Sequence, residues 1–138
     1  MATTTLLSGV NCLIGAVDVS DQVVTAVVTD AREALENTSL GSTYRTYTSG
    51  LGLGTIELDM YNSYGAGEVE ASLAAIVGTS VTITITGTSS ALESASNPKW
   101  VGSNMYLESF TPINSAYGAL SMSKATFKGG PLVRDITP

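Results

Sequence analysis

Alternation of apolar and polar residues dominates this chain. Residues 54–61, "GTIELDMY", alternate isoleucine, leucine and methionine with threonine, glutamate and aspartate, and residues 79–88, "TSVTITITGT", alternate valine and isoleucine with threonine. The stretch "VSDQVVTAVVTDA" (19–31) is rich in valine and threonine, which suit a pleated surface. A period of two predicts strands with one face toward a dry core and one toward water.

Two further apolar runs predict a hairpin. "WVGSNMYLESFTPI" (100–113) and "YGALSMSKATFKG" (117–129) flank the segment "NSA", which together with Pro112 is typical of a turn. The preceding segment "TSSALESASNPKW" (88–100) is small and polar and ends in Asn-Pro, so we expect a surface loop there.

One segment has a helical pattern instead. Within residues 67–77 the apolar residues fall at helical spacing, two glutamates stand in the first turn, and Gly78 follows the last apolar position. Acidic residues favour a helix N-terminus and glycine favours a helix end. We expect one short α-helix at about 67–77, packed on the sheet by its apolar side.

The chain of 138 residues fits a single domain spanning 1–138. The predicted elements indicate a mainly β protein, an antiparallel β-sandwich or partly closed barrel of about seven or eight strands with one helix laid against it. Residues 39–53, rich in glycine, threonine and tyrosine, precede the strand at 54–61 and raise the question of a ligand-binding loop.

Composition removes several functional classes. Charged residues make up 13% of the chain, the net charge is −6, and the six basic residues are scattered, which argues against a protein that grips nucleic-acid phosphates. The sequence contains no histidine, so serine and cysteine triads, most zinc sites and the usual general base are missing. We expect no enzyme activity, no metal and no cofactor.

Cys12 is the only cysteine, which excludes an intramolecular disulfide, and its apolar neighbours predict a small core residue. Residues 1–8 carry no basic segment typical of a secretory signal. No apolar run approaches the roughly 20 residues of a membrane span. We therefore expect a soluble protein without membrane insertion, made and kept in a cytoplasm.

Three other patterns have a plain and a functional interpretation. Glu57 and Asp59 share one strand face and could in principle do acid–base work, but two solvated charges are the commoner case. "GLGLG" (50–54) is followed by a strand rather than a helix and lacks the Lys-Ser/Thr pair of a phosphate-binding loop. Trp100 and six tyrosines could form a sugar-stacking platform, although buried or interfacial tyrosine is more common.

Strands with so little charge leave sheet edges that a monomer would normally guard with lysine or bulges. This favours a homo-oligomer whose sheets join across subunits, because joining satisfies the edge backbone groups.

The order of motifs from Val17 to Gly65, "VDVSDQVVTAVVTDAREALENTSLGSTYRTYTSGLGLGTIELDMYNSYG", resembles the tail tube (major tail) proteins of long-tailed, siphovirus-type bacteriophages, especially those of actinobacterial hosts. In that family a "V-D-V-S" element precedes an acidic strand, an "R-T-Y" arm and a "G-T-I-E-L-D" strand. Residues 64–85 resemble the family's helix-then-strand unit, and residues 94–137 resemble its closing hairpin.

The resemblance implies a structural virion protein located in the tail and made in the host bacterial cytoplasm. Such proteins form hexameric rings whose inner sheets join into one barrel, and the rings stack around a tape-measure protein between tail terminator and distal tail proteins. Double-stranded DNA passes through the lumen without specific binding, which an acidic wall favours by repelling phosphate. The alternatives are another virion protein, such as a tail completion, hub or decoration protein, a secretion-system tube, or a β-sandwich binding module.

The resemblance also implies residue roles. The segment of about 40–53 matches the family's long inter-strand arm, which is mobile in the free subunit and orders against another copy, and its glycines are expected to supply backbone freedom. Its candidate anchors are Leu40, Tyr44, Arg45, Tyr47 and Leu51. The candidate lumen-facing acidic residues are Glu57 and Asp59, with Glu33 and Glu36 next.

Overall fold

The computed structural model describes residues 11–66, 68–87 and 97–137. The N-terminal segment 1–8 and most of the predicted loop 88–100 therefore lie outside the described residues.

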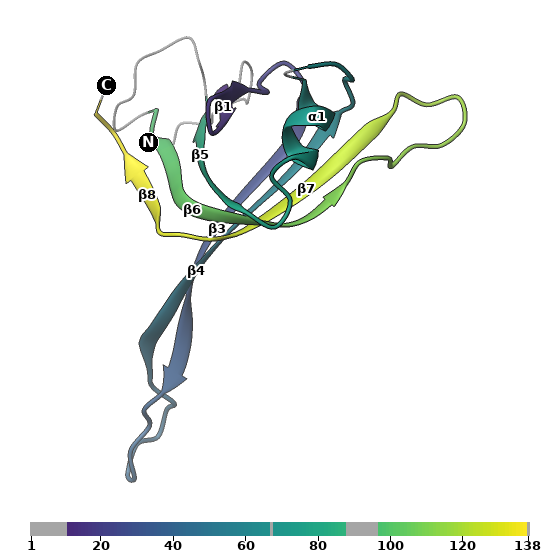
Figure 1. Ribbon diagram of the computed structural model, residues 1–138. Coiled ribbons are helices and arrows are strands. Elements are labelled where there is room, and N and C mark those ends of the chain that lie inside the picture. The colour runs from purple at the N-terminus through teal and green to yellow at the C-terminus, as the bar shows by residue number, and fades with distance from the viewer. Residues whose placement is uncertain (1–10, 67, 88–96, 138) are drawn as a thin grey trace, which may run out of the picture.

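The described residues form strands in a single antiparallel sheet, joined by one short helix (Figure 1). The strand order is β2-β1-β5-β6-β7-β4-β3, with β8 also paired to β6, so the sheet does not close. This confirms the predicted mainly β architecture. The elements are β1 (Asn11–Ile14), β2 (Val17–Asp18), β3 (Val23–Glu36), β4 (Tyr47–Tyr61), α1 (Val69–Ala74), β5 (Ser80–Thr86), β6 (Lys99–Thr111), β7 (Met122–Gly129) and β8 (Leu132–Asp135).

The sheet bends at the middle of β6. One half of β6 pairs with β7, the other half pairs with β8, and the chain passes between these partners through Gly129 and Gly130. A Cβ atom on Gly129 would lie 2.4 Å from the carbonyl oxygen of Asn104, so only glycine fits at this corner. The bend curls β8, β5 and β1 over the remaining strands (Figure 1).

The concave side of the bent sheet holds the core. Along β1, β4 and β7 alternate residues are buried there, as the period of two predicts, β3 contributes only partly buried residues, and α1 adds Val69 and Leu73 from above. Cys12 lies in this core, which confirms its predicted role as a small buried residue. The strand residues at the centre are Ile56, Leu58, Met60, Ile83, Met105, Leu107, Ala125 and Phe127.

The helix is shorter than the predicted 67–77. It spans Val69–Ala74, and the amide of Ile76 then donates to the carbonyl of Leu73, one residue closer than in an α-helix. The Gly78 amide donates to Leu107 of β6, so the chain leaves the helix to join the sheet. The helix therefore ends at Ala74, although the apolar pattern continues to Val77.

Strands β3 and β4 form a hairpin longer than the rest of the sheet. β4 pairs with β7 only from Gly54 to Tyr61, but it pairs with β3 down to Tyr47. Residues 30–53 consequently project from the body as an arm (Figure 1). The predicted arm at 40–53 was wrong in one respect, because residues 47–53 are strand and the connecting segment is 37–46.

Candidate assembly surfaces

The arm ends in a tip, residues 38–45, that is closed at its base by short hydrogen bonds. The Asn37 amide donates to the carbonyl of Thr46 at 2.9 Å, and the Thr46 hydroxyl donates to Oδ1 of Asn37 at 2.8 Å. Beyond this pair the side chain of Leu40 is 103% exposed, and Tyr44 is also exposed. The tip thus offers apolar groups that find no cover in the subunit.

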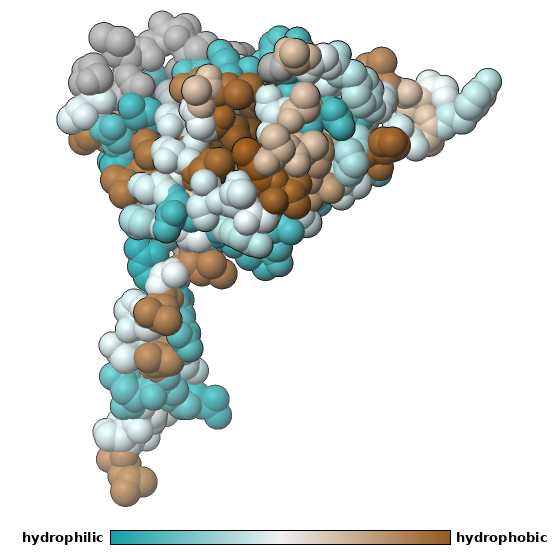
Figure 2. All heavy atoms as spheres, viewed as in Figure 1, coloured by the Kyte–Doolittle hydropathy of each residue, from teal (hydrophilic) through white to brown (hydrophobic). Residues whose placement is uncertain are grey.

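The other predicted anchors lie on the arm's strands. Nε of Arg45 lies 3.7 Å from Oε1 of Glu36, an exposed ion pair across the hairpin. Tyr47 and Leu51 project from β4, and the Leu51 side chain is 83% exposed. Figure 2 shows the arm as a separate projection with apolar residues spaced along it.

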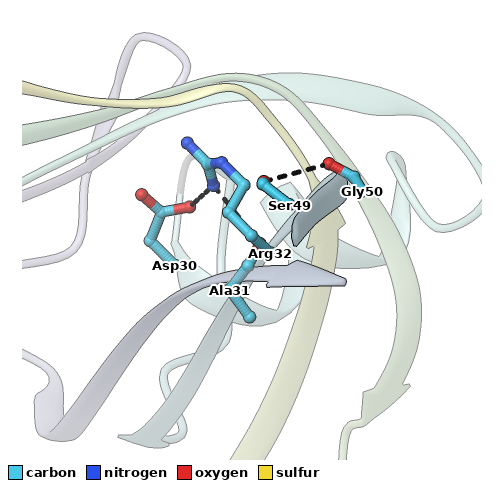
Figure 3. Close-up of polar contacts among 5 residues, drawn as sticks. All are labelled: Asp30, Ala31, Arg32, Ser49 and Gly50. Carbon is cyan, nitrogen blue, oxygen red and sulfur yellow. Dashed lines mark hydrogen bonds and ion pairs between the residues drawn. The ribbon is translucent and has the colours of Figure 1, made fainter. Parts of the chain in front are cut away.

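Glycines in β4 allow side chains of β3 to lie across the strand. A Cβ atom on Gly52 would lie 3.0 Å from Nη1 of Arg32, whose guanidinium group pairs with Asp30 at 2.5 Å (Figure 3). A Cβ atom on Gly50 would lie 3.0 Å from the Cβ of Glu33. The prediction that Gly50 and Gly52 supply loop freedom was wrong, because both lie within strand β4, Gly52 paired with Arg32 and Gly50 at a register shift, and both allow close cross-strand packing.

An open groove of about 470 Å³ lies where the arm leaves the body. Backbone of the glycine corner and the ion pair at the base of β3 line most of it, so it brings no catalytic set together. Within the described ranges no three His, Cys, Asp or Glu side chains gather as metal ligands, and no helix is both long and apolar enough to cross a membrane. The groove is lined by Asp30, Arg32, Gly52, Leu53, Gly54, Asn104, Gly129, Gly130 and Pro131.

Strand β3 has one unpaired edge along its whole length. It pairs with β4 on one side, and no described strand pairs with its other side. Its 14 residues, "VVTAVVTDAREALE", include no lysine, the residue that commonly guards an edge. At the opposite side of the β3-β4-β7-β6 portion, pairing of β6 with β5 stops at Tyr106. Leu107 also exchanges backbone hydrogen bonds with Gly78 and Thr79, so among the described residues this portion has a long free edge on β3 and a short one at residues 108–111 of β6.

The face of this four-stranded portion that points away from the core is called the open face. It carries Glu57 and Asp59, half-buried between their neighbours, so the prediction that these two share a polar strand face is confirmed. Glu33 and Glu36 lie elsewhere, on the arm. Glu57 and Asp59 are the candidate acidic pair that the structure brings together.

Sequence reasoning missed the basic side chains of the open face. Register places Lys124 directly opposite Asp59, and Lys128 follows two positions beyond Thr126, the partner of Glu57. Nζ of Lys128 lies 2.9 Å from Oε2 of Glu108 on β6. The alternation of residues 122–129 already puts both lysines on a polar face, but only the pairing register shows which carboxylates they meet.

Two titrating groups near the start of the chain are perturbed for structural reasons. Burial, reinforced by the negative charge of Asp18, raises the pKa of the Cys12 thiol to about 12, which keeps it protonated and unreactive at neutral pH. The hydroxyl and the amide of Ser20 donate to Asp18 and hold the pKa of its carboxyl below the usual value. Both belong to the body, and neither lies on the arm or the open face.

The fold is similar to that of proteins in tail and tube assemblies. A chain from the tail of an empty gene transfer agent particle with C6 symmetry matches with a TM-score of 0.63 and 12% identity, over 82% of this chain and 81% of that one. The SPP1 tail tube matches with a TM-score of 0.68 and 12% identity, over 92% and 76%. A chain from the sheath–tube complex of the PVC extracellular contractile injection system matches with a TM-score of 0.68 and 13% identity, over 94% and 89%.

No protein-family model matches the sequence, and no curated protein gives a significant match. At 12–13% identity the structural likeness shows the fold. The chain has the architecture found in the subunits of phage tails and related injection systems.

Proposed function

We propose that the chain is the tail tube subunit of a long-tailed, siphovirus-type bacteriophage with an actinobacterial host. The observation that carries the proposal is the β3-β4-β7-β6 portion, which has a core on one face, a polar open face, an unpaired edge along β3 and a shorter unpaired edge at residues 108–111 of β6. Such a sheet reaches full backbone pairing only by joining other sheets. Its fold is that of proteins found in tails and tubes.

In the proposed ring the β3 edge of one copy approaches the β6 edge of the next, so the sheets continue around a lumen lined by the open face. Six copies are favoured by the C6 symmetry of the gene transfer agent tail that this fold matches. The ring leaves the arm free to reach a neighbouring copy or the next ring, where Leu40, Tyr44 and Leu51 would be covered.

The remaining partners follow from the same proposal. Stacked rings would surround a tape-measure protein during assembly and would end at tail terminator and distal tail proteins. Double-stranded DNA would later pass through the lumen into the host cell. The completed tube belongs to the virion tail, after synthesis of its subunits in the bacterial cytoplasm.

The structure allows a sharper test than a long deletion. Because Asn37 and Thr46 already pair, residues 38–45 can be replaced by Asn-Gly, which closes two strands in a tight turn and keeps the hairpin. We expect this variant to have the unfolding midpoint of the wild type and to form no tubes in negative-stain electron microscopy. If the variant without the tip still formed long tubes, the proposal that the arm takes part in assembly would be wrong.

The wild-type images separate the broader possibilities. Long tubes with a lumen support the proposal, closed single rings indicate a terminator, hub or completion protein, and monomers indicate a binding module. The double variant Leu40→Ala and Tyr44→Ala keeps the length of the tip and removes its apolar groups. We expect it to shorten or abolish tubes, which would assign the effect to side chains rather than to tip length.

A second candidate is the inner tube of a contractile injection system. The match to the PVC sheath–tube complex over 94% of this chain favours it. Electron microscopy of whole particles distinguishes the two, because a contractile system shows a sheath around the tube and a siphovirus-type tail shows the bare tube.

A further inference from the structure

The open face is a mixed-charge surface rather than an acidic wall. Lys124 faces Asp59 across the β4–β7 pair, and Lys128 forms an ion pair of 2.9 Å with Glu108. Glu57 stands between the two lysines along this face, opposite Thr126. Directly opposed residues of antiparallel strands project to the same side, so these charges form one continuous group.

This group has more negative than positive charges. Three carboxylates face two ammonium groups, which leaves the open face with a small negative charge at neutral pH. Lysines on an otherwise uncharged face would attract the phosphates of a nucleic acid and release its counterions. Lys128 has a carboxylate at ion-pair distance, and Lys124 lies on the strand position opposite Asp59, so a phosphate that approaches either lysine also meets negative charge.

This arrangement affects the electrostatic potential of the open face more than the stability of the fold. Exposed ion pairs contribute little to stability, and Lys128 and Glu108 are both about half exposed. The lysines also relieve repulsion among the carboxylates, which would otherwise grow as copies assemble side by side. A face of paired charges combines weak self-repulsion with little affinity for polyanions.

We propose that Glu57, Asp59 and Glu108 mask Lys124 and Lys128, and that this masking keeps the open face from holding the phosphate backbone of duplex DNA. The biological use of the masking rests on the proposed tube function, in which DNA slides past this face. The masking itself is a property of the single subunit and is tested on dispersed protein. The DNA-binding result can therefore be interpreted even if tubes do not assemble.

The test is the binding of a fluorescent DNA duplex, followed by anisotropy at a series of salt concentrations. The triple variant Glu57→Gln, Asp59→Asn, Glu108→Gln removes the masking groups and keeps their size. We expect it to bind DNA about tenfold or more tightly than the wild type at low salt. Log affinity should fall against log salt with a slope of about −2, one unit for each exposed ammonium group. Glu108→Gln alone should release Lys128 and give a slope of about −1.

Two controls separate masking from a change in net charge. The variant Asp21→Asn, Glu68→Gln, Glu70→Gln also removes three negative charges, and none of these groups pairs with a basic side chain in the part of the chain that the structure describes. We expect it to bind DNA as weakly as the wild type. Adding Lys124→Gln and Lys128→Gln to the masking triple variant should abolish its binding.

Three cases of tight binding would overturn the proposal. They are wild-type binding as tight as that of the masking triple variant, tight binding by the remote triple variant, and persistent binding after both lysines are replaced. A masking triple variant that stays folded, shown by an unchanged Trp100 fluorescence spectrum, and still ignores DNA at low salt would equally reject it.

Discussion

The two halves of β4 differ although they belong to one continuous strand. From Gly54 to Tyr61 the strand lies between β3 and β7, and Leu58 is fully buried. From Tyr47 to Leu53 it pairs with β3 alone, and Leu51 is 83% exposed. Both halves are strand, but the number of neighbouring strands decides whether an apolar side chain becomes core.

The residues on one side of β4 also differ between the two halves. Where the body half carries Ile56 and Leu58, the arm half carries Gly52, and the side chain of Arg32 on β3 lies over it. An isolated two-stranded hairpin is at best marginally stable in water. The arm is therefore stabilised by the pairing of β3 with β4 and by its attachment to the body. Contact with another copy would add the stability that a free hairpin lacks.

The largest expected difference comes from one substitution made in both halves. Leu58→Ala deletes a fully buried side chain and should lower the free energy of unfolding by about 2–5 kcal/mol. Leu51→Ala touches an exposed arm residue and should stay within about 0.5 kcal/mol of the wild type. Urea unfolding of the dispersed subunit, followed by Trp100 fluorescence, measures both. Equal losses in the free energy of unfolding would mean that Leu51 is packed in solution, contrary to its exposure in the structure.

A glycine pair sharpens the boundary between the halves. A Cβ atom on Gly54 would lie 2.7 Å from the side chain of Leu132, which is buried, so Gly54→Ala should cost about 1–3 kcal/mol. A Cβ atom on Gly52 would meet only the flexible end of Arg32, so Gly52→Ala should lie within about 0.5 kcal/mol of the wild type. The same urea titration compares them, and a Gly52→Ala loss as large as that of Gly54→Ala would move the start of the arm toward the tip.

The sequence predicts the body better than the arm, for physical reasons. Alternation identifies the strand faces, and apolar neighbours identify the burial of Cys12, because each of these positions meets a fixed environment. It does not extend β4 back to Tyr47, since Gly50 and Gly52 carry no strand signature and act only through side chains of β3. The local sequence pattern does not predict this part of β4, because its packing depends on contacts with side chains of β3.

The candidate surfaces show the same limit. The acidic pair Glu57 and Asp59 is visible from a spacing of two, because that spacing alone places both on one face. Their basic neighbours are not, since Lys124 reaches Asp59 only through the register of β4 with β7. Helix α1 likewise ends at Ala74, although its apolar pattern continues to Val77, because the chain then turns to bond with β6 through Gly78.

The smallest effect on stability is expected from a cysteine introduced as a reporter. It compares the body and the arm by the reaction rates of their thiols rather than by the free energy of unfolding. In the wild type, burial and a pKa of about 12 keep the Cys12 thiol protonated and covered, so a disulfide reagent at neutral pH should modify it only as fast as the body opens. Leu51→Cys adds a second thiol on the exposed arm, which should react at the rate of a free cysteine while the unfolding midpoint stays unchanged.

Absorbance of the released thiolate counts both groups. Leu51→Cys should show one fast and one slow equivalent in native buffer, and two fast equivalents in urea. Combining Leu51→Cys with Leu58→Ala should accelerate the slow equivalent alone, because loss of core packing raises the population of the open body and leaves the arm as accessible as before. A slow Leu51→Cys thiol in the dispersed subunit would show that the arm folds back and is covered, and a fast Cys12 thiol would show that the body opens as readily as the arm.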